Sequence, residues 1–188
     1  MNNKVRKQVT WSCEDFELSH EPVGDSIEVE ETVIGFIVKY LVQDDNAENP
    51  FLNWDGEGKI IFNSESSYVC NKDVNFEKAI KHKYAVVLDA YIHSGIALSV
   101  SGGGVQCQWD TSHNIAVWVP DEDCSIKSKK QAIKCAEQAC NLFNQYANGD
   151  VYGCCVDRYD KDKHYIDGDS VWGYFGYDDA KELLKNEF

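Results

Sequence analysis

The stretch YAVVLDAYIHSGIALSVSGGGVQCQWDTSHNIAVWV, residues 84–119, decides the fold class. It begins with an almost unbroken apolar run, apolar residues then alternate with polar or small ones at 96–100 and 105–110, and a short apolar run follows at 115–119. This period of two is typical of β-strands, and short connections favour antiparallel neighbours. The stretch therefore predicts an antiparallel meander of four strands, with turns at 93–95, 101–104 and 110–114.

A long helix is predicted to follow these strands. Ser128 and Gln131 fit a capping box, in which both side chains satisfy free backbone N–H groups at a helix start. Apolar residues then recur at steps of three and four as far as Tyr146, and Asn148 with Gly149 supplies a stop signal. Because such a helix has one apolar stripe, we expect it to pack on the sheet.

The N-terminal part of the chain carries further strand patterns. Residues 4–18 alternate loosely, and residues 27–32 and 33–42 have the apolar, β-branched character of strands. Residues 74–82 predict a short helix with Asp73 as its N-cap. We expect residues 1–48 to form an acidic strand region that belongs to the same fold as the rest of the chain.

The C-terminal part predicts a strand pair and a closing helix. Strands are expected at 150–156 and 169–175 around a charged loop at 157–168, and a helix at 180–188. Together with the central stretch, residues 49–188 then make one α+β domain. The predicted fold class is α+β, a mainly antiparallel sheet with one long helix packed on it and a short C-terminal helix.

Negative charge is the main global property of the sequence. The formal net charge is −14, and residues 11–50 alone hold eleven acidic residues and one basic residue. Residues 150–188 hold ten acidic and five basic residues, whereas residues 84–120 hold only two acidic ones. Such a field repels nucleic acids and membrane surfaces and attracts basic partners. Glu28 and Glu30 would lie about 6.6 Å apart on one face of a strand.

The sequence predicts a cytoplasmic protein. No window has the length and apolarity of a membrane span, and the basic N-terminus is not followed by the apolar core of a secretory signal. Eight cysteines without such a signal indicate reduced thiols rather than a disulfide framework.

No sequence pattern specifically predicts a metal site, a cofactor site or a catalytic group. The cysteines lack the spacing of a zinc site, and Cys107 with His93 or His113 remains an alternative nucleophile pair that nothing nearby would activate. The glycines at 102–104 lack the lysine and the helix of a phosphate-binding loop. The aspartates of the C-terminal loop do not fit a calcium-binding loop, and a solvated loop is expected: Asp157, Asp160, Asp162, Asp167 and Asp169.

Three groups of motifs nevertheless resemble a family. The first is NP at 49–50 with WD at 54–55; the second is HSGI at 93–96, CQWD at 107–110 and VWV at 117–119; the third is NGDVYG at 148–153 and DSVWGYFG at 169–176, and their order and spacing agree with the family. They are similar to an uncharacterised family carried by bacteriophages and mobile elements, in which DHSGI, CPWDSG, YDQYLTGDVYG and DSCWGFYG follow one another. The resemblance covers residues 49–180 and implies a phage or prophage origin, but no activity. Its motif residues are expected to be structural: His93, Trp109, Asp110, Asp150 and Trp172.

These observations favour a binding protein over an enzyme. We expect a phage-encoded acidic inhibitor of a bacterial defence system, an anti-CRISPR or antirestriction protein that acts as a DNA mimic. Its partner would be a basic host protein or a protein–RNA surveillance complex in the host cytoplasm, with no direct contact to nucleic acid or membrane. The alternatives are a small enzyme using His93, Asp110 and Cys107, or a virion or assembly protein. The predicted partner-binding residues are acidic: Glu14, Glu17, Glu21, Asp25, Glu28, Glu30, Glu31, Asp160, Asp162 and Asp167.

Overall fold

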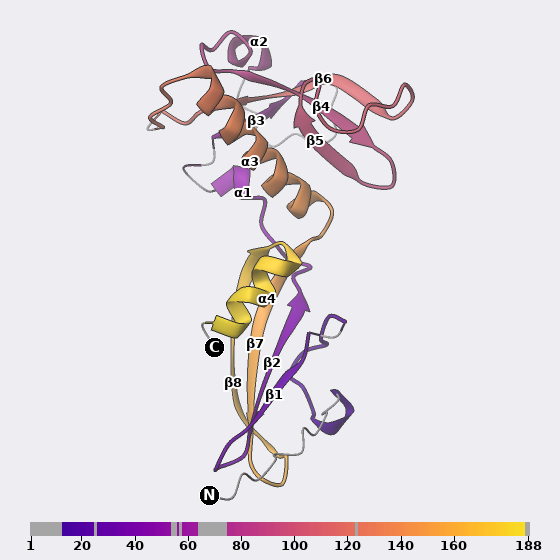
Figure 1. The fold of residues 1–188 in the computed structure, drawn as a ribbon, viewed down its shortest axis with the longest axis vertical. Coiled ribbons are helices and arrows are strands. Elements are labelled where there is room, and N and C mark those ends of the chain that lie inside the picture. The colour runs from indigo at the N-terminus through magenta and orange to yellow at the C-terminus, as the bar shows by residue number, and fades with distance from the viewer. Residues whose placement is uncertain are drawn as a thin grey trace, which may run out of the picture. The chain divides into compact units, whose positions relative to one another are not determined.

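The computed structural model describes residues 13–24, 26–53, 56, 58–63, 75–122 and 124–186 (Figure 1). The chain has an α+β fold and divides by its contacts into two units. Unit 1 contains Met1–Asp45 and Val151–Phe188, and unit 2 contains Asn46–Asp150. The sequence predicted a boundary between two regions at residue 48. In the structure, the C-terminal residues from Val151 onward belong to the same unit as the N-terminal ones. Among the described residues, no helix is long and apolar enough to cross a membrane.

Unit 1 is built on one antiparallel sheet with both faces of its central strands covered. Phe16 of the N-terminal segment packs on one face, against Val38 and Tyr159, and Leu184 of the C-terminal helix packs on the other, against Leu41. This double burial explains the near-continuous apolar sequence of the central strands. The strand order is β1-β2-β7-β8. The elements are η1 (Cys13–Asp15), β1 (Glu28–Glu31), β2 (Phe36–Gln43), β7 (Val151–Tyr159), β8 (Tyr165–Phe175) and α4 (Tyr177–Asn186).

Unit 2 has a second antiparallel sheet, of order β3-β6-β4-β5, with the long helix on one face. The core between them includes Leu88 and Trp118 from the sheet and Ala136 and Phe143 from the helix. Figure 1 shows this helix lying across the strands. The elements are α1 (Pro50–Asn53), β3 (Lys59–Phe62), α2 (Phe76–Ala79), β4 (Val86–Ile92), β5 (Ile96–Val100), β6 (Thr111–Val119) and α3 (Lys129–Ala147).

The long helix is confirmed with both of its predicted ends. Ser128 is the N-cap, and its hydroxyl accepts the backbone N–H of Gln131 at 3.1 Å. The Gln131 side chain reaches back to the N–H of Lys127 at 2.9 Å, one residue earlier than a capping box requires. Asn148 is the C-cap, and Gly149 follows with a positive φ of 71°, the conformation that favours glycine.

The predicted meander is wrong in its third strand. Residues 105–110 form a loop, and the turn expected at 110–114 is instead the start of β6. β6 does not pair with β5; it pairs with the opposite edge of β4, where Val86 faces Trp118. The physical reason is that β5, the outer strand, has its second edge occupied by α3: the Asn144 and Asn148 side chains bond the backbone N–H and C=O groups of Leu98 and Ile96, where a third strand would have to pair.

Four smaller predictions are also corrected. The 33–42 strand starts only at Phe36, because Thr32 and Gly35 bond each other to close a hairpin turn. The helix expected at 74–82 is the short α2, capped by Asn75, while Asp73 lies outside the described residues. The loop expected at 157–168 shrinks to residues 160–164 because β7 and β8 are longer. Of the strand expected at 4–18, residues 4–12 lie outside the described residues and Cys13–Asp15 is a 3₁₀ helix.

Candidate functional site

The acidic residues are concentrated in unit 1. By sequence, unit 1 holds 19 acidic and 9 basic residues, a formal charge of −10, and unit 2 holds 13 and 9, a charge of −4. All ten predicted partner-binding residues belong to unit 1, and all except Asp25, which lies outside the described residues, can be placed. The predicted acidic region therefore belongs to one structural unit, although its residues come from both ends of the sequence.

A buried carboxylate holds the acidic N-terminal segment on the sheet. Asp157 of β7 is 1% exposed and accepts hydrogen bonds from the Ser19 N–H at 2.9 Å, the Ser19 hydroxyl at 2.9 Å and the Tyr40 hydroxyl at 2.7 Å. The Tyr159 hydroxyl also reaches this carboxylate and donates to the carbonyl of Glu17 at 2.8 Å. Burial, with a further contribution from Asp157, raises the pKa of Tyr40 and of Tyr159, so both hydroxyls stay protonated donors.

The two hairpins of unit 1 end at the same edge of the sheet. Phe36, which follows the β1–β2 turn, pairs with Tyr159 at the end of β7, and Gly35 packs directly on the backbone of Tyr159 and Asp160. The N-terminal segment reaches the same edge, because Lys163 of the β7–β8 loop bonds Asp15 at 3.3 Å. Three segments far apart in the sequence thus meet at one end of unit 1.

This end combines exposed apolar side chains with carboxylates. Val33 and Ile34 at the β1–β2 turn are 87% and 79% exposed, and Tyr165 and Ile166 of β8 are also exposed. Val33 and Ile34 were predicted to lie in a buried strand, and that prediction is wrong; Tyr165 and Ile166 were expected in the charged loop and lie in β8 instead. We call the whole group the hairpin-end surface: Glu14, Glu17, Glu30, Glu31, Val33, Ile34, Asp160, Asp162, Tyr165 and Ile166.

Six of the nine described acidic candidates belong to the hairpin-end surface, and three do not. Glu28 lies opposite Lys39 and pairs with Lys185 of α4 at 3.7 Å. Asp167 is bound by Arg158 at 2.8 Å. Glu21 lies toward the other end of the sheet, since the nearby Val23 bonds Leu41. By contrast, four glutamates of the hairpin-end surface form no ion pair within the described residues: Glu14, Glu17, Glu30 and Glu31.

The aspartates expected in one charged loop are distributed differently. Asp157 is buried in the sheet, and Asp167 and Asp169 lie on β8. In the loop itself, Asp160 accepts the backbone N–H groups of Asp162 and His164, at 2.8 and 2.9 Å, and lies 3.2 Å from the His164 ring. The backbone bond from His164 contributes most to a lowered pKa of Asp160. These bonds close the hairpin. They explain why the side chains of Asp160, Asp162 and His164 lie close together without a bound cation.

His93, Asp110 and Cys107 of unit 2 lie close together, but His93 and Cys107 do not form a nucleophile pair. His93 Nδ1 lies 3.4 Å from Asp110 Oδ2, and Cys107 Sγ lies 3.6 Å from the same oxygen. The carboxylate therefore contacts both groups, and within the described residues no hydrogen bond joins the Cys107 thiol to an imidazole. Unit 2 has a cavity of about 530 Å³ beside Lys78 and His82 and one of about 270 Å³ beside Cys140. His93 lines neither of them.

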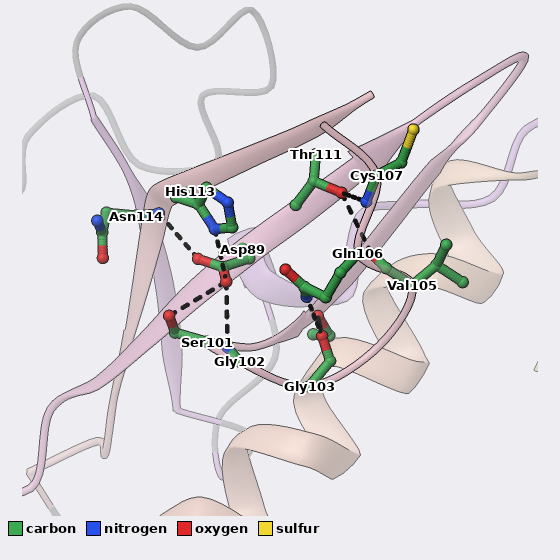
Figure 2. Close-up of polar contacts among 11 residues, drawn as sticks. Asp89, Ser101, Gly102, Gly103, Val105, Gln106, Cys107, Thr111, His113 and Asn114 are labelled. Atoms are coloured by element: carbon green, nitrogen blue, oxygen red, sulfur yellow. Dashed lines mark hydrogen bonds and ion pairs between the residues drawn. The ribbon is translucent and has the colours of Figure 1, made fainter. Parts of the chain in front are cut away.

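A second buried carboxylate, Asp89, organises the loop after β5 (Figure 2). It accepts the backbone N–H groups of Asn114 and Gly102, at 2.9 and 3.1 Å, and the Ser101 hydroxyl at 3.1 Å, and it lies 3.1 Å from His113 Nδ1. No sequence motif marks this centre. The signal present in the sequence is Asp89 itself, a single acid within the apolar run at 84–92: an acid buried with such a strand needs several hydrogen-bond donors around it.

The pH dependence of unit 2 should reflect Asp89. Burial alone would raise its pKa, but the bonds from Asn114, His113, Gly102 and Ser101 outweigh burial and lower it below the ordinary value of 3.8. A lowered pKa in the folded state stabilises the fold above the ordinary pKa, and this contribution is lost as the pH falls through the lowered value. We expect Asp89→Asn to cost about 1–2 kcal/mol at neutral pH and to flatten the acid limb of the unfolding curve. An unchanged acid limb in urea titrations between about pH 2 and 5, a range that brackets the ordinary pKa of 3.8, would contradict this assignment.

The remaining motif residues have different surroundings. Trp109 is 87% exposed at the surface of the 101–110 loop and therefore does not belong to the core. Trp172 lies over Gly153 and donates to the Ser170 hydroxyl at 3.0 Å. Asp150 follows α3, where its N–H bonds the carbonyl of Gln145.

The six cysteines whose side chains are described are free thiols. Three are buried, and burial raises the pKa of Cys140 and Cys155 to about 12 and of Cys154 to about 11. Such thiols remain protonated and unreactive at neutral pH, in agreement with the reduced thiols expected from the sequence.

No protein-family model, curated protein or solved structure matches the chain.

Proposed function

We propose that this protein binds a cationic surface of another protein through the hairpin-end surface of unit 1. The observation that carries the proposal is the combination found there: an exposed apolar centre, Val33 and Ile34, beside four glutamates that have no basic partner among the described residues. Protein interfaces commonly have an apolar centre and a polar rim. An acidic rim selects a basic partner and accelerates its association.

The partner class follows from the charge. Surfaces that hold nucleic acid are dense in lysine and arginine, so a protein with a formal charge of −10 in one unit can compete for them. Together with the resemblance to phage-borne proteins, this makes a bacterial defence complex the first target to test. The protein would then act as an anti-CRISPR or antirestriction inhibitor in the host cytoplasm, as a mimic of DNA.

Charge reversal tests the proposal. In cells with an active CRISPR or restriction system, the native protein should restore phage plating, and the variant Glu30→Lys/Glu31→Lys/Asp162→Lys should not. Three reversed rim charges are expected to weaken binding by about 10- to 100-fold, at roughly 0.5–1 kcal/mol each. Glu182→Lys is the matched control, because Glu182 is exposed on α4, which packs near the opposite end of the sheet.

The same comparison can be made with purified components. Inhibition of DNA cleavage should be competitive with DNA and should fall severalfold between about 0.1 and 0.5 M salt, because ions screen exposed charges. Inhibition that survives both the triple reversal and high salt would refute the proposal. Activity that disappears in His93→Ala but persists in the triple reversal would favour the enzyme alternative, for which the contact between His93 and Asp110 is the supporting observation.

A further inference from the structure

We propose that β8 is a docking edge for an extended basic segment of the partner, which would add a fifth strand to the sheet of unit 1. This inference rests on the proposed function and specifies how part of the partner is held. In strand addition, backbone hydrogen bonds supply affinity and the alternate side chains supply specificity.

The edge is long and open. β8 is the outer strand of the order β1-β2-β7-β8, and within the described residues no other strand pairs with its free side (Figure 1). All eight residues from 165 to 172 are exposed. Natural proteins usually protect such edges with lysine, proline, bulges, other charges or a covering segment. β8 contains neither lysine nor proline, and the part between its two register shifts is regular enough to be a template for another strand.

The regular part of the edge is short and chemically distinctive. Register shifts interrupt the β7–β8 pairing on either side of Asp167–Val171, which leaves five residues in continuous register opposite Cys154–Arg158. Within this segment Asp167, Asp169 and Val171 share one face, because side chains alternate along a strand. Gly168 and Ser170 on the other face are small, so an incoming backbone meets little steric resistance.

Charge complementarity identifies the occupant. Side chains directly opposite each other on paired strands interact, so the incoming strand should place one basic residue opposite Asp169, one opposite Asp167, which Arg158 already bonds, and an apolar residue opposite Val171. The matching motif is basic-x-basic-x-apolar, in either chain direction. A second copy of this chain fits less well, because antiparallel pairing of two β8 strands about Gly168 sets Asp167 of each copy against Asp169 of the other.

A peptide with this motif tests the edge directly. The probes are acetyl-Thr-Lys-Thr-Lys-Thr-Val-Thr-amide, which matches a parallel strand, and acetyl-Thr-Val-Thr-Lys-Thr-Lys-Thr-amide, which matches an antiparallel one. Each is added to the full chain while amide hydrogen exchange and affinity are measured by NMR. We expect new protection confined to the segment 167–171. A peptide of either sequence with every backbone nitrogen methylated keeps the charge but cannot pair, and it should bind at least about tenfold more weakly. Asp169→Lys should weaken binding comparably, whereas the matched control Glu182→Lys should not.

Each other outcome rejects the edge. Equal binding of the methylated peptide, with protection absent from β8, would show attraction by charge alone, which overturns the inference and leaves the hairpin-end proposal intact. Concentration-dependent protection of residues 167–171 in the chain without peptide would identify a second copy as the occupant. The hairpin-end proposal fails by a separate result, the retention of inhibition in the triple reversal.

Discussion

Replacement of Asp157 by alanine is expected to lower the free energy of unfolding of unit 1 by about 3 kcal/mol, because several buried donors lose their acceptor together. The Ser19 N–H and the Tyr40 hydroxyl bond this carboxylate at 2.9 and 2.7 Å, and the site is 1% exposed, so water cannot replace the lost acceptor without opening the fold. The N-terminal segment should also detach, since Ser19 is joined to the sheet through Asp157.

Residue-resolved hydrogen exchange is the suitable measurement, because a chain of two units need not unfold in one step. Asp157→Ala should abolish protection of the Ser19 amide and reduce it along β2 and β7, while α3 in unit 2 stays unchanged. Asp169→Ala is the matched control, because this carboxylate lies exposed on the adjacent strand and its loss should change stability by less than about 0.5 kcal/mol. Similar effects of the two substitutions would show that Asp157 is not the anchor.

Local sequence signals predicted the elements that depend on local chemistry. The capping box at Ser128 and the stop at Asn148 define α3, and the apolar run at 84–92 contains β4. These predictions succeeded because a helix cap or a strand pattern is encoded within a few residues. The α+β fold class followed from them.

Pairing partners were not predictable in the same way. Residues 105–110 alternate like a strand, yet an alternating pattern becomes a strand only where a neighbouring edge is free, and the side chains of Asn144 and Asn148 occupy the outer edge of β5. Thr111 instead holds the loop, accepting the Cys107 N–H at 2.8 Å and donating to the carbonyl of Val105 (Figure 2). Val105 and Trp109 are thereby left exposed.

The candidate site depended on the same long-range information. The acidic character of residues 11–31 was visible in the sequence, but their meeting with Asp160 and Asp162 follows from the pairing of β2 with β7, which joins residues more than a hundred positions apart. Asp157 was expected in a solvated loop because its donors, Ser19 and Tyr40, are equally remote in sequence. Burial of a carboxylate can be inferred only when its donors are known.

Gly35→Ala is the second substitution with a large expected effect, about 3 kcal/mol or more on unit 1. A methyl group at this position would collide with the carbonyl oxygen of Tyr159 and with the backbone of Asp160. Neither obstacle is a flexible side chain, so relief requires the β1–β2 turn to separate from the end of β7. Overpacking a filled site costs about 1–3 kcal/mol even where side chains can yield, and a rigid backbone yields less.

The matched control is Gly24→Ala, which separates steric collision from backbone preference. Gly24 has a φ of 52° and nothing within 4 Å of the added carbon, so alanine there should cost only about 1 kcal/mol for its left-handed backbone. Because Gly35 positions the turn that carries Val33 and Ile34, Gly35→Ala should also weaken partner binding, while Gly24→Ala leaves it unchanged. Equal stability losses in the two variants would mean that the two hairpin ends are not packed against each other, and the hairpin-end surface would then lose its structural basis.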